Sequence, residues 1–255
     1  MQDHETIFDK IKELLGSIPN QLNVLEDKID IDLQLEYFEY SRRVRKDLKS
    51  DLVLNESYKL FDTNISQEVK KSILAKIASI DKVEAYRIIE RFLKTIPGEL
   101  KNWSILALQD NRMLLESRLL DENHVFISTG LGGKGEKLRY FVVIFGKNLT
   151  DFSDLQRKII RNEIEISLKK HNSELEELNF SGSLATILTM IPMKVIIKQI
   201  FTEAIEECNH FGDFLIANFI ITNVKSLSFE EIREYIENQQ KLSGEGKLNK
   251  DEPSI

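Results

Sequence analysis

The sequence predicts an α+β fold, in which a helical N-terminal half is followed by a mixed β-sheet flanked by helices. Apolar residues recur at helical spacing as far as about residue 120, and beyond it come runs rich in Val, Ile, Phe and Tyr, which are typical of strands. This change near Asp121 predicts a helical domain over 1–121 and an α/β domain over 122–240. The polar tail over 241–255 is expected to be disordered.

Amphipathic helices are predicted over 7–18, 33–48, 69–80, 83–96 and 99–120, because each range carries one apolar stripe. Asp81, with Glu84 three residues later, predicts the start of the fourth helix, and Pro97 and Gly98 predict its end. Trp103 in the fifth helix is expected to be buried. The short connections fit either a plain bundle or helical hairpins that resemble HEAT repeats, and no internal sequence repeat decides between them.

In the second half, strands are predicted over 124–129, 138–145, 175–180 and 214–221, and helices over 151–170, 184–208 and from Ser228 onward. Asp151 is the expected cap of the first of these helices, and Ser228 with Glu231 forms a capping box for the last. Pro192 kinks the apolar helix or marks a new start. Helices between successive strands require crossovers, so the sheet is expected to be partly parallel, with 214–221 as its central strand.

The composition of the chain limits the partners and the compartment that can be expected for it. The 42 acidic and 35 basic side chains give a net charge of −7, which argues against broad nucleic-acid binding. A single cysteine excludes an internal disulfide, and the polar start lacks the features of a secretory signal, so a cytoplasmic protein is expected. Lys194 and Lys198 interrupt the apolar range 184–208 too soon for a membrane span.

The main candidate site is a glycine run between the first two predicted strands, Gly130 to Gly135. It has the letters of a dinucleotide-binding motif, but the residues after it predict a strand where that motif needs a helix. It has the spacing of a P-loop, but Glu136 stands where the phosphate-binding lysine belongs. A plain hairpin loop that joins the two strands is the alternative interpretation.

Backbone amides, hydroxyls and cations around this run predict an anion-binding site made of Ser128, Thr129, Gly130, Gly132, Gly133, Lys134, Gly135, Lys137 and Arg139. Its ligand is either a phosphate group or an acidic partner chain. No cofactor is expected, because none of the motifs is complete.

Other candidates are weaker. Glu207 and His210 have the spacing of metal ligands on a helix but lack a second such pair, so no metal is expected. Acidic neighbours and an apolar helix raise the thiol pKa of Cys208, which disfavours nucleophilic catalysis. The densest cationic cluster, Arg42, Arg43, Arg45 and Lys46, lacks interleaved aromatic residues and predicts a partner-binding or solvated surface.

No complete set of catalytic residues can be assembled, so the sequence favours a non-enzymatic cytoplasmic module that binds a protein partner, with no nucleic acid and no membrane expected as partners. The alternative hypothesis is an enzyme or sensor that binds a small phosphorylated ligand through the loop 130–135.

Overall fold

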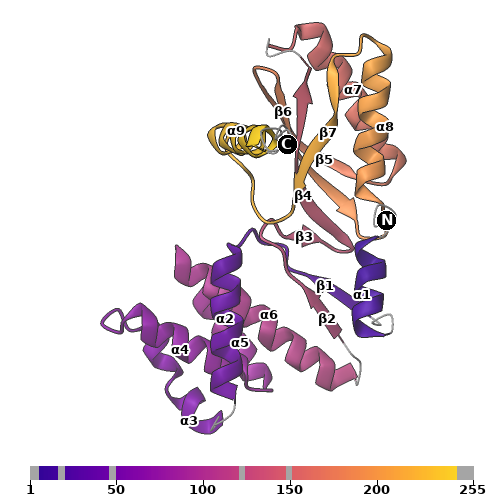
Figure 1. The fold of residues 1–255 in the computed structure, drawn as a ribbon. Coiled ribbons are helices and arrows are strands. Elements are labelled where there is room, and N and C mark those ends of the chain that lie inside the picture. Colours follow the sequence, from indigo (N-terminus) through magenta and orange to yellow (C-terminus); the bar gives the residue numbers. More distant parts are fainter. Residues whose placement is uncertain (1–5, 17–20, 46–49, 121–123, 148–150, 246–255) are drawn as a thin grey trace, which may run out of the picture.

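The computed structural model describes residues 6–16, 21–45, 50–120, 124–147 and 151–245, and the chain forms a helical body and an αβ body (Figure 1). The helices are α1 (Ile7–Leu15), α2 (Ile31–Val44), α3 (Ser50–Asn55), the 3-10 helix η2 (Ser57–Phe61), α4 (Gln67–Ala78), α5 (Val83–Leu93), α6 (Glu99–Leu120), α7 (Asp154–Lys170), α8 (Ile197–His210) and α9 (Phe229–Glu245). The strands are β1 (Gln21–Val24), β2 (His124–Ile127), β3 (Gly133–Lys134), β4 (Lys137–Gly146), β5 (Glu174–Ser181), β6 (Leu184–Pro192) and β7 (Leu215–Thr222). The predicted α+β class is confirmed.

The αβ body is built on an antiparallel sheet with the strand order β7–β4–β6–β5, and the short β3 also pairs with β4. The chain order β4–α7–β5–β6–α8–β7 gives the split βαβ, or ferredoxin-like, arrangement. The prediction of a mixed sheet is wrong for this sheet. The two strands that each crossover helix connects, β4 with β5 and β6 with β7, are not neighbours, because an antiparallel strand lies between them. The predicted central position of 214–221 is also wrong, since β7 pairs with β4 alone among the described strands.

Both faces of this sheet are covered. Tyr140, Val142 and Ile144 of β4 belong to a core cluster with residues of α7 and α8, whereas Phe141 and Val143 cluster with Ile232 of α9. Figure 1 shows α9 on the opposite face of the sheet from α7 and α8. Covering on both sides explains why β4 reads as an almost continuous apolar run.

The predicted apolar helix over 184–208 is wrong in its first part. Residues 184–192 form β6, and the helix begins only at Ile197. A buried strand and a buried helix both read as unbroken apolar sequence, so periodicity alone cannot distinguish them. Pro192 marks the end of the strand and not a helix kink.

The helices α2 and α4 to α6 pack around a separate core, in which Trp103 is 1% exposed, as expected. Its helix, α6, has the predicted bounds. The start of α5 was predicted at Asp81, but the N-cap is Lys82, whose side chain makes no capping hydrogen bond.

The two bodies meet through α1, β1 and the glycine run. Ile7, Phe8 and Ile11 of α1 pack against the core of the αβ body. β1 pairs in parallel with β2, so the predicted hairpin between 124–129 and 138–145 is wrong. The position beside β2 is taken by β1 and by Leu25, whose amide donates to Ile127 O. The hairpin that does form joins β3 to β4.

Of the predicted helix starts in the second half, one is wrong and one is confirmed. α7 starts at a capping box of Ser153 and Gln156, not at Asp151, while Ser228 and Glu231 cap α9 as predicted. α9 continues to Glu245, so the expected disorder does not begin at residue 241, and residues 246–255 lie outside the described part of the chain. No described helix is both long and apolar enough to cross a membrane.

Candidate functional site

The glycine run lies at the junction of the two bodies and is mostly buried. The amide of Leu131 donates to Asn223 O at 3.0 Å, that of Gly132 to Thr129 O at 3.2 Å and that of Gly133 to Leu25 O at 2.8 Å. These three amides therefore donate within the protein, where the predicted anion site requires them to point at a ligand.

Close backbone packing explains why glycine occupies three of these positions. A Cβ atom on Gly130 would lie 1.7 Å from Val224 O, one on Gly132 would lie 2.6 Å from Glu26 O, and one on Gly133 would lie 2.3 Å from Lys137 O. No side chain fits at such distances. The run is thus a docking point for chain segments from both bodies, which the sequence does not indicate because each contact is long-range.

The hydroxyls and the arginine of the predicted site are also part of this junction. Thr129 Oγ1 donates to Gly132 O at 3.2 Å, and Ser128 is half-buried. Arg139 binds both carboxylate oxygens of Glu176 and donates to Leu131 O at 2.6 Å. Its charge is paired, and its side chain fastens the glycine run to the sheet.

Lys134 and Lys137 are separate from this buried network, because they flank the tip of the β3–β4 hairpin. Gly135 has φ +60° at the first turn position, which identifies a type II′ turn. Lys134 is exposed, and Lys137 binds Glu174 at 2.6 Å. The hydrogen bond and charge of Lys137 lower the pKa of the Glu174 carboxyl.

Two lysines of the apolar range 184–208 follow β6, and the first of them contacts this hairpin. Lys194 Nζ is 3.4 Å from Glu136 Oε2, and Met193 N donates to Glu136 O at 3.0 Å, so the loop after β6 contacts the hairpin tip. Lys198 is exposed in the first turn of α8, four residues further on. We call Lys134, Lys137, Lys194 and Lys198 the lysine surface.

The positive end of a helix dipole reinforces this surface. The N-cap of α8 is Ile196, whose side chain makes no capping hydrogen bond, and the first turn of the helix has no acidic residue. The positive partial charge of its first amides therefore adds to the lysines. Within the surface, Glu174 pairs with Lys137 and Glu136 pairs with Lys194.

The other end of α8 is acidic. A pocket of about 390 Å³ between α7 and α8 is lined by Glu163, Glu203, Glu206 and Glu207, together with Lys170. Hydrogen bonds from Lys170 and Gln199 lower the pKa of Glu203 to about 2. The net charge of −7 is thus unevenly distributed, with lysines near the N-terminal end of α8 and glutamates toward its C-terminal end.

This pKa predicts how acid affects stability. Since the Glu203 pKa is depressed from 4.5 to about 2, its contribution to folding is present above about pH 4.5 and is lost as the pH falls toward 2. We expect the difference in melting temperature between the wild type and Glu203→Gln to shrink across that interval. A difference that stays constant from pH 6 to pH 2 would contradict the assignment.

Cys208 has the surroundings expected for an inert thiol. It is 1% exposed, and burial raises its pKa to about 12, with Glu163 and Glu207 adding to the effect. His210 Nδ1 lies 3.2 Å from Glu207 Oε2 on the surface. Within the described ranges, no group of three or more His, Cys, Asp and Glu residues is placed to hold a metal ion.

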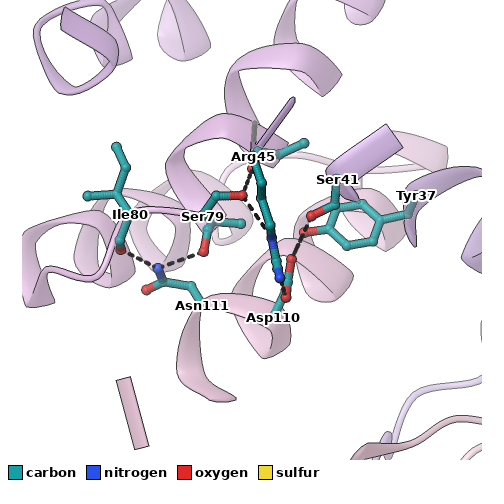
Figure 2. A network of polar contacts seen from close by, with 9 residues as sticks. Tyr37, Ser41, Arg45, Ser79, Ile80, Asp110 and Asn111 are labelled. Atoms are coloured by element: carbon teal, nitrogen blue, oxygen red, sulfur yellow. Dashed lines mark hydrogen bonds and ion pairs between the residues drawn. The ribbon is translucent and has the colours of Figure 1, made fainter. Parts of the chain in front are cut away.

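The arginine cluster of α2 is used mainly within the helical body. Figure 2 shows Asp110 accepting hydrogen bonds from Tyr37 Oη at 3.0 Å and Ser41 Oγ at 2.9 Å, and pairing with Arg45. Arg45 Nε also donates to Ser79 Oγ, and the guanidinium carbon of Arg43 lies 5.6 Å from the centre of the Tyr40 ring.

Beside this network, Asn111 Nδ2 donates to the carbonyls of Ala78 and Ile80, which closes the C-terminal end of α4 (Figure 2). Of the predicted cluster, Arg42 is exposed, and Lys46 lies outside the described residues. The contacts of Arg43 and Arg45 are those of a structural element of the helical body.

Comparison with solved structures finds similar folds of low identity. A putative transposase from Deinococcus radiodurans R1 is 17% identical with a TM-score of 0.35, and the match covers 42% of this chain and 94% of that one. A REP-associated tyrosine transposase bound to a REP hairpin is 10% identical with a TM-score of 0.31, and the match covers 39% of this chain and 61% of that one. No protein-family model matches the sequence, and no curated protein matches it.

These neighbours correct the predicted function. Both are transposases, which contradicts the expectation of a protein-interaction module with a protein partner and no nucleic acid. At this level of identity and TM-score the likeness concerns the fold, so the function has to be argued from the site itself.

Proposed function

We propose that the chain binds nucleic acid through its phosphate backbone, at the lysine surface of Lys134, Lys137, Lys194 and Lys198. The observation that carries the proposal is that Lys134 and Lys137 flank the tip of the β3–β4 hairpin, where the contact between Lys194 and Glu136 joins the loop after β6 to it. Lys198 follows four residues later in the first turn of α8. Phosphodiesters carry one negative charge per nucleotide, so lysines brought together at one end of the sheet match a chain of phosphates.

The distribution of charge supports this surface over the rest of the αβ body. The opposite end of α8 carries the glutamates of the pocket, which would repel phosphates. A ligand is therefore oriented toward the N-terminal end of α8. Lys134 and Lys137 keep the anion-binding role predicted for them, whereas the buried amides and Arg139 do not.

The body that holds the surface also includes α1, since Ile7, Phe8 and Ile11 pack on its core. We propose that residues 6–16 and 128–245 form this unit, and that the helical body is its scaffold. The stacking of α2 to α6 as a bundle or as HEAT-like hairpins, and the domain boundary near residue 121, stay predictions.

Binding by fluorescence anisotropy tests the proposal. For the full chain and a labelled single-stranded oligonucleotide, four lysines predict a slope of about −3 in log K against log salt. The double variant Lys134→Ala/Lys194→Ala is expected to bind about tenfold more weakly at low salt, from roughly 0.7 kcal/mol for each lysine, and to halve the slope.

Two controls separate this site from the effect of net charge. Lys158→Ala/Lys169→Ala removes the same charge from exposed positions of α7 and is expected to leave affinity nearly unchanged. Glu136→Gln removes a carboxylate that pairs with Lys194 and is expected to raise affinity, a gain that unfolding cannot produce. Absence of binding at low salt, or equal losses in both double variants, would refute the proposal.

A further inference from the structure

Phe8 lies beside the lysine surface and is held there by its own helix. α1 starts at a capping box between Thr6 and Asp9, and the amide of Phe8 donates to Met193 O at 3.2 Å. Met193 in turn donates to the backbone of Glu136 at the hairpin tip. Main-chain hydrogen bonds therefore hold the backbone of Phe8 next to the loop after β6 and the hairpin tip.

The group over this ring is an exposed ammonium. Lys194 Nζ lies 5.0 Å from the centre of the Phe8 ring, and the Lys194 side chain is 58% exposed. The same ammonium lies 3.4 Å from Glu136, so it is shared between a carboxylate and the ring. A cation–π contact at such an exposed site is weak, and a phosphate can draw the ammonium away from the ring.

An aromatic ring among phosphate-binding lysines suits unpaired bases. In a duplex the bases are stacked inside the helix, whereas in a single strand each base offers a flat face that can stack on an aromatic side chain. We infer that Phe8 is a stacking platform for a base, and that the lysine surface prefers single-stranded nucleic acid. This inference rests on the proposed function and adds the class of ligand.

The ligand supplies a test that does not depend on any variant. Wild-type protein is compared on a single-stranded oligonucleotide, on the duplex of the same sequence and on a strand whose central sugars are abasic. The abasic strand keeps the phosphates and loses the bases, so we expect it to bind about fivefold or more weakly than the intact strand. The duplex is expected to show a similar loss.

Two variants identify Phe8 as the residue responsible. Phe8→Leu keeps an apolar side chain on the core and is expected to lose the same fivefold on the single strand, with little change on the duplex. Phe8→Trp keeps an aromatic ring and, unlike Phe8→Leu, is expected to keep the preference for the single strand over the duplex. Equal binding of intact and abasic strands would overturn the inference while leaving the proposed function standing, whereas no binding to any of the three ligands would overturn both.

Discussion

Gly130→Ala is expected to destabilise the protein by about 3 kcal/mol or more, at the upper end of the range for overpacking. The new Cβ would lie 1.7 Å from Val224 O, 2.7 Å from Val224 C and 3.2 Å from a side-chain carbon of Ile31. Two of these are backbone atoms, so relief requires that the segment after β7 move away from the junction. Urea unfolding followed by circular dichroism measures the loss.

Two further glycines separate packing from backbone strain. Gly135→Ala meets nothing within 4 Å but has φ +60°, so strain alone is expected to cost about 1 kcal/mol. Gly132→Ala combines φ +69° with a Cβ 2.6 Å from Glu26 O and is expected to cost more than Gly135→Ala. If Gly130→Ala were no worse than Gly135→Ala, the close packing at the junction would be refuted.

The same residues show what sequence reasoning can and cannot reach. The glycine run was identifiable as unusual, and positive φ at Gly135 follows from hairpin chemistry. The role of Gly130 depends on Val224, which lies 94 positions later, and no local pattern reports such a contact. The helices α1, α2, α4, α5 and α6 were predictable because an amphipathic stripe is a local signal, whereas the short α3 and η2 lie outside the predicted ranges.

The errors on β6 and β7 both come from reading apolar sequence as a sign of structure type or position. β6 is buried on both faces, so its apolar run lacks the alternation that identifies a strand. β7 reads as a central strand because it is apolar, yet it lies at an edge with Ile216 39% exposed. The order of strands in a sheet depends on long-range contacts, so the composition of one strand does not predict its neighbours.

For the candidate site, half of the lysine surface could be named in advance. Lys134 and Lys137 stand next to a conspicuous motif, whereas Lys194, Lys198 and Phe8 come from distant segments. The contact between Lys194 and Glu136 exists because β6 ends beside the start of β4, with Pro192 paired to Lys137. Once residues 184–192 are assigned to a helix, that proximity cannot be inferred.

Trp103→Ala is expected to have the largest effect in the helical body, a loss of about 3–5 kcal/mol, as for other large aromatic residues in a core. The ring is 1% exposed, packs edge-to-face on Tyr37 at 5.2 Å, and donates from Nε1 to Lys71 O at 3.1 Å. Trp103→Phe keeps much of the volume and removes only the hydrogen bond from the indole to Lys71 O, so a smaller loss is expected. Thermal and urea unfolding of both variants give the comparison.

Lys71 lies between this ring and carboxylates at the surface. Its charge predicts that the stability lost in a Lys71 variant depends on pH, unlike the stability lost in Trp103→Ala. Its side chain is 9% exposed, lies 4.9 Å from the Trp103 ring centre and pairs with Glu36, Glu68 and Glu99. Desolvation lowers the Lys71 pKa, but the hydrogen bond to Glu99 and the charges of the three carboxylates together raise it above 10.5.

A raised lysine pKa contributes stability that is complete below about pH 10 and disappears as the pH rises through the folded-state value. Lys71→Met should therefore be less stable than the wild type at pH 7 and approach it as the pH rises through the raised pKa of Lys71, because both proteins then lack the charge. The penalty of Trp103→Ala, in contrast, comes mainly from lost packing and should persist at high pH. A Lys71→Met penalty that does not shrink as the pH is raised above 10.5 would mean that the lysine acts through the packing of its methylenes and not through its charge.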